Sequence, residues 1–330
     1  MSLPQDGRRA GQVAAEAHDS YVLALDVGGT TMKAALTGPD NVPRFETRRP
    51  TGSGVGPDGA VAAILDLAGE LRAIGEERFG GPPAAAGVAL PGIVDEAAGV
   101  AVYSANLGWR DVPFRRLLSE RLGGGIPVAV GHDLRVAALA EGRLGAGVGV
   151  DRFLLVALGT GIAAALSIDG RTEPGAHGRA GELGHVVVRP GGPPCSCGQR
   201  GCLEVVASAA AVGRAWAAAA GAPGLDAADA ARAVAAGDPR AAVVWERAVD
   251  ALADGLLAAI SLLDPRTLIV GGGLAEAGET LLTPLRAALA ARAVVLHQLP
   301  EIVPAGLGDA AGCLGAGLLA WDRALAVVPS

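Results

Sequence analysis

A strand-turn-strand pattern occurs twice in this chain, and it limits the fold more than any other feature. Residues 21–36 contain an apolar run, the turn Gly28-Gly29-Thr30 and a second apolar run. Residues 153–168 repeat this order around the turn Gly159-Thr160-Gly161. Each copy predicts two short antiparallel strands joined by a tight glycine turn. Because the copies begin about 130 residues apart, we expect two similar domains that each present a glycine turn to a shared cleft.

The rest of the chain alternates apolar runs with stretches of helical periodicity, which predicts an α/β fold. Strands are expected at residues 84–90, 126–130 and 267–270 and near Val294–His297. Helices are expected at residues 58–79, 132–144, 203–220, 226–236, 240–263, 277–292 and 309–323. A P-loop is disfavoured because no GxxxxGK followed by Ser or Thr occurs. A Rossmann turn is disfavoured because the first glycine turn precedes a strand and not a helix.

The composition limits the possible partners. The chain has 330 residues, a formal net charge of −7 and 3% aromatic residues. Its length suits two domains, since single hydrophobic cores stop growing at about 250–300 residues. The negative charge and the few aromatic rings argue against nucleic acid as a partner. No membrane partner is expected, because the apolar runs are short and interrupted. Residues 1–20 are expected to form a flexible leader without the apolar core of a secretion signal, so we expect a cytoplasmic protein.

Three of the four cysteines, Cys195, Cys197 and Cys202, lie within eight residues of one another, and His185 precedes them. Three thiolates and one imidazole are a ligand set that a structural zinc ion takes in a tetrahedron. We favour zinc over two alternatives, which are a reduced thiol cluster and one disulfide with a spare cysteine. The fourth cysteine, Cys313, falls in an apolar helical stretch and is expected to lie in the core.

The sequence allows two roles for each of several carboxylates and for one lysine. Glu182 and Glu204 flank the cysteine cluster, where each could orient the histidine or point into a cleft. Asp133 follows a strand and opens a helix, so it is either a helix cap or a catalytic group. Asp26 ends the first strand and either forms the turn or holds Mg²⁺ through water. Lys33, the one lysine of the chain, lies in the next strand and is either simply exposed or close to a nucleotide.

Two motifs together resemble the sugar-and-zinc signature of the ROK family (repressors, open reading frames and kinases). They are Gly178-Arg-Ala-Gly-Glu182-Leu-Gly-His185 and Cys195-Ser-Cys197-Gly-Gln-Arg-Gly-Cys202-Leu-Glu204. The resemblance runs from Leu23 to about Leu319 and is nearest to the bacterial glucokinases of the family. It implies a duplicated actin-like (ribonuclease H-like) sugar-kinase fold with two domains around a cleft and a small structural zinc site. The implied domains are residues 21–131 with the C-terminal helix 312–330, and residues 132–311, which would carry the zinc motif and a dimerisation surface.

The resemblance implies an enzyme that transfers phosphate from ATP, with Mg²⁺, to the 6-hydroxyl of a hexose, most simply glucose. It implies that Asp133 is the general base and that the metal ligands for structural Zn²⁺ are His185, Cys195, Cys197 and Cys202. The sugar would be bound by Asn106 of the motif Asn106-Leu-Gly-Trp109 and by His132, Asp133, Glu182, His185 and Glu204. The nucleotide would be bound by Asp26, which lies near Mg²⁺, and by Gly28, Gly29, Thr30, Lys33, Gly159, Thr160, Gly161, Gly271, Gly272 and Gly273. Leu90-Pro91-Gly92-Ile-Val-Asp95 resembles a turn beside the cleft, and members of the family often form dimers, so a homo-oligomer (dimer or tetramer) is expected.

The chain departs from the family pattern at three places near the implied site. In the first turn, which reads Thr30-Thr31-Met32-Lys33, Lys33 falls at a position where related kinases vary. The family usually has Asn-Asp-Ala-Asn where this chain has His132-Asp133-Leu134-Arg135. His132 could still donate to a sugar hydroxyl, and Arg135 could contact a phosphate or an anionic group of the substrate. The second glycine turn continues Ile162-Ala163-Ala164 where further glycines are common, and the added methyl groups could crowd the nucleotide or alter the donor.

Other functions remain open on the sequence alone. The changed residues around Asp133 leave an N-acetylglucosamine or N-acetylmannosamine kinase as an alternative, and the altered second turn leaves a non-catalytic sugar sensor. A transcriptional regulator of the family would need a winged helix of roughly 60–80 residues before the first glycine turn. Only about 20 polar residues precede Leu23 here, so we expect a kinase. Polyphosphate also remains open as a phosphate donor.

Overall fold

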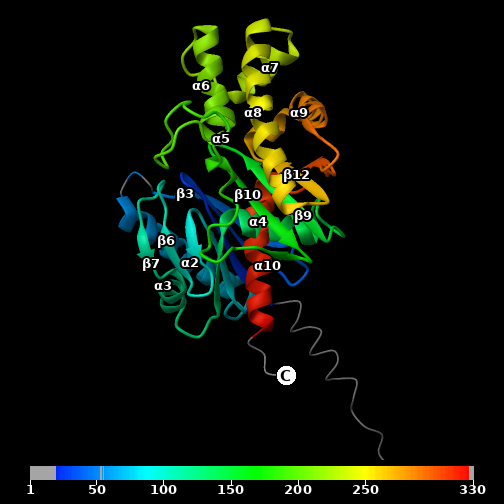
Figure 1. The fold of residues 1–330 in the computed structure, drawn as a ribbon. Coiled ribbons are helices and arrows are strands. Elements are labelled where there is room, and N and C mark those ends of the chain that lie inside the picture. Colours follow the sequence, from blue (N-terminus) through cyan, green and yellow to red (C-terminus); the bar gives the residue numbers. More distant parts are fainter. Residues whose placement is uncertain (1–19, 53, 55, 327–330) are drawn as a thin grey trace, which may run out of the picture. The chain divides into compact units, whose positions relative to one another are not determined.

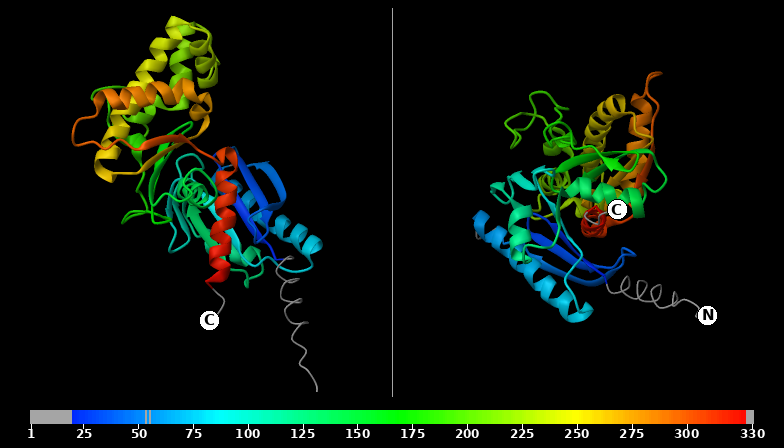
Figure 2. Two further views of the ribbon diagram at one scale, coloured as in Figure 1. Left: turned by 90° about the vertical axis from the view of Figure 1, so that its right-hand side faces the viewer. Right: turned by 90° about the horizontal axis from the view of Figure 1, so that it is seen from below.

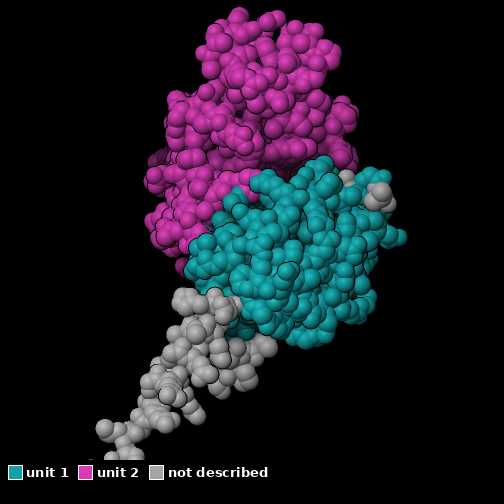
Figure 3. Space-filling view, turned by 180° about the vertical axis from the view of Figure 1, so that it is seen from behind, with its two compact units in different colours: residues 1–140, 310–330 teal, residues 141–309 magenta. Residues whose placement is uncertain are grey.

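The computed structural model describes residues 20–52, 54 and 56–326. The expected leader lies outside these residues except for Ser20, as do residues 327–330 of the expected C-terminal helix. The chain divides into two compact units, shown in two colours in Figure 3. Unit 1 comprises residues 1–140 and 310–330, and unit 2 comprises residues 141–309. The chain thus first passes from unit 1 to unit 2 inside helix α4 (Asp133–Leu144). The expected boundary, between residues 131 and 132, lies before that helix.

Unit 1 is built on a five-stranded sheet with the strand order β3-β2-β1-β4-β8. Figure 1 labels β3, at one edge of this sheet. The strands are β1 (Val22–Val27), β2 (Thr31–Thr37), β3 (Pro43–Pro50), β4 (Ala86–Leu90) and β8 (Val128–His132). β1, β2 and β3 are antiparallel neighbours, whereas β4 runs parallel to β1 and β8 runs parallel to β4. β1 and β4 are almost wholly buried, which explains why they appear in the sequence as continuous apolar runs.

Helices cover both faces of the unit 1 sheet. On one face Leu23, Leu25 and Val27 pack in the same core as α2 (Gly56–Phe79) and α3 (Phe114–Arg121). On the other face the small residues Ala24 and Ala89 pack against α10 (Ala311–Leu325). A small antiparallel sheet of β5 (Ile93–Asp95), β6 (Val100–Tyr103) and β7 (Arg110–Val112) completes the unit. Because strand side chains alternate between faces, small residues on one face let a helix approach closely while large residues fill the other.

Unit 2 repeats the architecture of unit 1. Its sheet has the order β11-β10-β9-β12-β13. The strands are β9 (Arg152–Leu158), β10 (Ile162–Ile168), β11 (Arg171–Thr172), β12 (Thr267–Gly271) and β13 (Glu301–Pro304). Three consecutive antiparallel strands are again followed by two parallel ones, in the same spatial order as in unit 1. The duplication indicated by the sequence is therefore confirmed.

The helices of unit 2 lie after β11 in the chain. They are α5 (Leu203–Ala207), α6 (Ala209–Ala220), α7 (Ala227–Ala235), α8 (Pro239–Leu263) and α9 (Glu279–Arg292), with single turns η2 (Leu183–His185), η3 (Gly273–Ala277) and η4 (Gly308–Ala310). α6 and α7 pack on α8, and α9 packs along it (Figure 2). The helix expected at 203–220 is two helices, because Ser208 is extended and its hydroxyl accepts a hydrogen bond from Ala211 N at the start of α6.

One expected strand is wrong. Residues Val294–His297 form a turn, and the strand that pairs with β12 is β13, at Glu301–Pro304. Val295 is 99% exposed and Leu296 is 89% exposed, so these apolar residues have no sheet to enter. The sequence also gave no sign of the small sheet β5–β7, whose strands are too short for periodicity. Among the described residues, no helix combines the length and apolar character needed to cross a bilayer.

Candidate active site

The first glycine turn of unit 1 is held from two sides. Gly28 N donates to Thr31 O at 3.0 Å across the turn, and Thr51 Oγ1 donates to Gly28 O at 2.7 Å. A Cβ atom on Gly28 would lie 2.8 Å from Thr31 O, so the tight turn requires glycine there. Thr51 is fully buried. The sequence did not point to Thr51, because it follows an exposed polar strand and has no motif of its own.

Asp26 and Lys33 are direct partners across β1 and β2. Lys33 Nζ lies 3.5 Å from Asp26 Oδ2, and the two side chains are 21% and 16% exposed. Asp26 also lies against the first turn of α10, since a Cβ atom on Gly312 would be 2.5 Å from the Asp26 carboxyl carbon. The positive end of the helix dipole favours a carboxylate at this place. Gly312 carries no signal in the sequence, because its role depends on a strand that lies far away along the chain.

Asn106 lies beside the first glycine turn. A Cβ atom on Gly29 would be 3.6 Å from Asn106 Cβ and 3.8 Å from Asn106 Nδ2. The Asn106 side chain is exposed, whereas Trp109 in the same motif is 1% exposed and packs edge-on against Phe114, with ring centroids 5.1 Å apart. A buried indole anchors the loop, and the exposed amide is left to contact solvent or a ligand.

Asp133 is the first residue of α4 and directly follows β8. Its Oδ1 accepts a hydrogen bond from Leu134 N at 2.7 Å and lies 3.2 Å from His132 Nε2. The bond from Leu134 joins neighbouring residues and does not reach the second or third helical N–H, so the helix-cap interpretation is not supported. Crowding by the surrounding protein desolvates the carboxylate and raises the pKa of Asp133 to about 6, although 39% of the side chain remains exposed.

Arg135, in the same turn of α4, is held inside unit 1. Its side chain is 2% exposed, and its Nε donates to Glu96 Oε1 at 2.7 Å. The structure therefore does not support a contact between Arg135 and a phosphate or anionic substrate. Glu96 was not among the expected site residues. It directly follows the Leu90–Asp95 turn motif, so the nearest signal in the sequence ended one residue before it.

The second glycine turn, in unit 2, is held by Glu204. Gly159 N donates to Gly161 O at 2.9 Å across the turn, and Glu204 Oε2 accepts from Ile162 N at 3.1 Å. A Cβ atom on Gly161 would collide with the Glu204 carboxylate. At least one oxygen of this expected sugar-binding residue thus supports the turn. The Ala164 methyl, one of the two that depart from the family pattern, packs in the core of unit 2.

The third glycine segment lies against the second turn. Gly272 has φ of 84°, and a Cβ atom on it would be 2.7 Å from backbone atoms of Leu158, the residue just before Gly159. Only glycine tolerates both the positive φ and this approach. The segment Gly271–Gly273 and the turn Gly159–Gly161 therefore lie next to each other in unit 2.

The cysteine cluster forms one compact set of ligand atoms. The Sγ atoms of Cys197 and Cys202 are 3.6 Å apart, and Cys195 Sγ is 3.6 Å from His185 Nδ1. All four ligand atoms lie within 4.8 Å of one another. Zinc bonds of about 2.3 Å to sulfur and about 2.0 Å to nitrogen give tetrahedral edges of about 3.5–3.8 Å. The two 3.6 Å distances match those edges.

The glycines and the thiols around this cluster fit the same interpretation. Gly198 and Gly201 have φ of 93° and 75°, values that favour glycine, and they let the chain curl around the ligand atoms. Burial raises the pKa of the Cys202 thiol to about 12, whereas the backbone N–H of Gln199 lowers the pKa of Cys197. A divalent cation is what ionises such a buried thiol.

Glu182 faces the side of His185 that points away from the cluster. Its Oε2 lies 3.7 Å from His185 Nε2, while His185 Nδ1 faces Cys195. The two side chains are 49% and 31% exposed. One ring nitrogen is therefore directed at the cysteines and the other at a carboxylate, an arrangement in which a carboxylate orients a metal-bound histidine.

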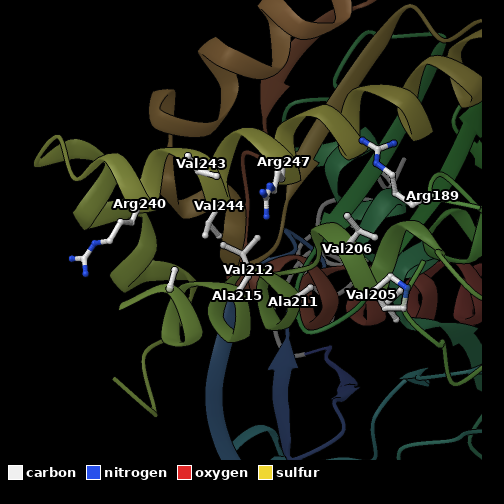
Figure 4. Close-up of a pocket in the computed structure, with 12 residues that line it drawn as sticks. Arg189, Val205, Val206, Ala211, Val212, Ala215, Arg240, Val243, Val244 and Arg247 are labelled. Atoms are coloured by element: carbon white, nitrogen blue, oxygen red, sulfur yellow. The ribbon is translucent and has the colours of Figure 1, made fainter. Parts of the chain in front are cut away.

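The expected site residues fall into separate groups within each unit. Unit 1 holds Asp26, Lys33 and Asn106 around the first glycine turn, and it holds His132 with Asp133. Unit 2 holds the other two glycine segments with Glu204, and it holds Glu182 and His185 with the cysteines. None of them lines the groove of about 700 Å³ between α6 and α8, whose walls include Val212 and Val244 (Figure 4).

The chain matches a sequence model of one protein family over most of its length. The model described as "ROK family" matches residues 22–323. The chain belongs to the ROK family.

Members of the ROK family with similar sequences include sugar kinases of different substrates. A glucokinase of Halalkalibacterium halodurans is 33% identical over 327 residues, which cover 91% of this chain and 95% of the relative. An N-acetylmannosamine kinase of Escherichia fergusonii is 30% identical over 306 residues, covering 92% of this chain and 99% of the relative. The solved structure of a ROK family glucokinase from Streptomyces griseus, in complex with glucose and AMPPNP, is 29% identical with a TM-score of 0.78, covering 92% of this chain and 100% of that chain.

Proposed function

We propose that this protein is an ATP-dependent hexose 6-phosphotransferase that acts most simply on glucose, a glucokinase. The observation that carries the proposal is the Asp133 carboxylate at the start of α4, with a pKa raised to about 6. A group with this proton affinity is ionised at neutral pH and can still accept a proton from a hydroxyl. The similarity to a ROK glucokinase solved with glucose and an ATP analogue supports the same activity.

In the proposed reaction, Asp133 removes the proton of the sugar 6-hydroxyl as that oxygen attacks the γ-phosphate of ATP. Within the described residues, Leu134 N and His132 Nε2 contact this carboxylate, and both contact Oδ1. We therefore assign Oδ2 as the atom that takes the proton. A positioned general base contributes about 10²–10⁴-fold to the rate.

The nucleotide is assigned to the three glycine segments and to Asp26. Phosphoryl transfer needs little covalent chemistry from a protein, so positioning and neutralisation of phosphate charge supply most of the catalysis. Backbone N–H groups of Gly28–Thr30 and Gly159–Gly161 would contact phosphate oxygens, and Gly271–Gly273 would lie towards the adenosine. Asp26 is a carboxylate of the kind that Mg²⁺ takes, and its pairing with Lys33 at 3.5 Å favours a contact through water. Mg²⁺, when bound with ATP, supplies the neutralisation of the phosphates.

The sugar is assigned to six side chains, which are Asn106, His132, Asp133, Glu182, His185 and Glu204. The exposed Asn106 amide and the carboxylates of Glu182 and Glu204 are donors and acceptors suited to ring hydroxyls. His185 would be fixed by the metal through Nδ1, so its Nε2 and the neighbouring Glu182 would form a rigid polar wall. Rigid partners reduce the entropy lost on binding.

The Cys3His cluster is proposed to hold a structural Zn²⁺ ion. Its four protein ligands, with ligand atoms within 4.8 Å of one another, would leave no open position for a substrate, which is typical of structural sites. The zinc would fix η2 and the start of α5, the two elements that carry His185 and Glu204.

The proposal also includes a homo-oligomer formed through unit 2 and a cytoplasmic location. Exposed apolar residues on unit 2, among them Leu262, Val295 and Leu296, support a surface that another copy covers. ATP as the donor supports the cytoplasm. Light scattering of the purified protein tests the first point, and fractionation of the source cells tests the second.

A coupled assay with ATP and Mg²⁺ over a panel of hexoses tests the activity. Turnover with glucose at a higher kcat/KM than with any other sugar is the expected result. Absence of turnover on every sugar, with sugar binding retained, would overturn the proposal and favour a sensor. The same assay with polyphosphate in place of ATP identifies the phosphate donor.

A second candidate substrate is an N-acetylated hexosamine, in particular N-acetylmannosamine. The observation that favours it is His132-Asp133-Leu134-Arg135 in place of the usual motif, together with the similarity to an N-acetylmannosamine kinase. The panel therefore includes N-acetylmannosamine and N-acetylglucosamine. A kcat/KM for either that exceeds the value for glucose replaces the first candidate by the second.

A further inference from the structure

The turn between β5 and β6 is bound directly to the first turn of α4. One carboxylate oxygen of Glu96, in that turn, accepts hydrogen bonds from two donors, one at the end of β8 and one in α4. Glu96 Oε1 accepts from the backbone N of His132 at 3.1 Å and from Arg135 Nε at 2.7 Å. These donors precede and follow Asp133 in the chain. The same oxygen therefore ties together both sides of the residue that carries the proposed base.

Glu96 is itself fixed by α3. Arg115 Nη2 donates to Glu96 O and Arg115 Nη1 donates to Ala97 O, both at 2.6 Å. Arg115 N also bonds Gly99 O, at the far side of the turn. The Glu96 carboxylate thus projects from a turn that cannot shift without breaking several hydrogen bonds.

We propose that Glu96 is a positioning residue for phosphoryl transfer, which holds the backbone at His132 and the Arg135 side chain so that the Asp133 carboxylate keeps its reactive orientation. The inference rests on the proposed function, because it assigns Glu96 a task towards the proposed base. Glu96 does not touch the carboxylate of Asp133 and acts through its neighbours.

The geometry explains why this link is needed in this chain. His132 and Arg135, which supply the two donors to Glu96, both depart from the usual Asn-Asp-Ala-Asn motif, as does Leu134, which lies between Asp133 and Arg135. His132 Nε2 lies 3.2 Å from Asp133 Oδ1, so a shift of the His132 backbone moves a direct neighbour of the base. A base displaced by about 1 Å can lose about 100-fold in rate. Arg135 is 2% exposed, and a buried guanidinium requires an acceptor such as Glu96.

Two variants separate positioning from simple loss of charge. Glu96→Ala removes the acceptor, so kcat is expected to fall about 10- to 100-fold while KM for sugar and ATP changes less than about threefold. Glu96→Gln keeps a carbonyl oxygen that can accept from His132 N and Arg135 Nε, so it is expected to retain at least about a third of kcat. Glu120→Ala, which removes the exposed partner of Arg116 on α3, is the matched control and keeps kcat within about twofold.

Asp133→Asn provides the test of mechanism. If Glu96 acts through Asp133, adding Glu96→Ala to Asp133→Asn lowers the residual rate by less than about threefold, because the positioned group is already lost. Equal fold losses in both backgrounds would overturn the positioning role. So would a Glu96→Ala protein that keeps kcat within about twofold, or a Glu96→Gln protein as impaired as Glu96→Ala. Wild-type kcat in Asp133→Asn itself would refute the assignment of the base, which is a different failure.

Discussion

His132 and Asp133 are adjacent in the chain and also in contact, with His132 Nε2 lying 3.2 Å from Asp133 Oδ1. The same oxygen accepts the N–H of Leu134. Because His132 and Leu134 both contact Oδ1, the other carboxylate oxygen, Oδ2, is left to face a substrate. This asymmetry of the carboxylate is the basis for the first two predictions.

Asp133→Asn is expected to lower kcat by about 10²–10⁴-fold, which leaves a small residual rate, and to leave sugar affinity within about an order of magnitude. The amide has nearly the same shape and can still bond Leu134 N, but it cannot accept a proton at neutral pH. Steady-state kinetics and titration with the sugar give the two quantities. A substantial residual rate would remove Asp133 from the role of base.

The rate is expected to depend on pH through Asp133. Its pKa is raised to about 6, so below this pH the carboxyl is protonated in the folded protein and cannot act as a base. The value of kcat/KM for the sugar should therefore rise about tenfold per pH unit below about pH 6 and level off above about pH 7. A profile that is flat from pH 5 to pH 7 contradicts this prediction.

The cysteine cluster is expected to bind one zinc ion, and the protein is expected to lose stability without it. Ligand atoms within 4.8 Å of one another repel when all are ionised, and a divalent cation removes that repulsion. Metal analysis should give about one equivalent, and Cys195→Ser should lower both the zinc content and Tm. Cys313→Ala is the control, since Cys313 lies in α10, where it is buried against Ala24 of β1 and is outside the cluster. Zinc content below about half an equivalent, with normal folding of Cys195→Ser, contradicts the site.

Local patterns made some features of this fold predictable. The hairpins β1–β2 and β9–β10 were correctly expected because each combines apolar strands with a glycine turn inside one short segment. The cysteine cluster was predicted, and its ligand atoms do converge, because three of its four ligands are within eight residues. Cys313 was correctly placed in the core because its helix is apolar from Ala311 to Trp321.

Features that depend on distant segments could not be predicted. Glu96 and Arg135 are 39 residues apart, and their pairing follows from the way the small sheet β5–β7 sits beside β8. The sequence did not predict β3, because it is an edge strand whose alternate residues are arginine and other polar side chains. The sequence left open a contact between Arg135 and a phosphate or an anionic group of the substrate, because arginine is mostly exposed, whereas an acceptor supplied by the fold let it be buried.

Gly161→Ala is expected to lower kcat/KM for ATP by about tenfold or more. The added methyl group would collide with the Glu204 carboxylate, which holds Ile162 N at the end of the second glycine turn. Moving Glu204 or the turn displaces groups assigned to sugar and phosphate. Gly125→Ala is the matched control, because a Cβ atom there meets nothing within 4 Å. Kinetics of Gly161→Ala that match those of the control would show that this contact is not needed.

Glu141→Ala is expected to destabilise unit 2 by at least about 3 kcal/mol. Glu141 is fully buried near the end of α4, where its Oε2 accepts from Ala146 N at 2.8 Å and Gly306 N at 3.0 Å and its Oε1 accepts from Leu307 N at 2.9 Å. Alanine leaves these three N–H groups without an acceptor, whereas Glu141→Gln keeps one carbonyl oxygen and should cost about 1–3 kcal/mol. Urea denaturation gives the free energies of unfolding. Glu246→Ala, on the exposed side of α8, is the control and should stay within about 0.5 kcal/mol of the parent protein. If Glu141→Ala unfolds at the same urea concentration as this control, the three hydrogen bonds do not stabilise the unit.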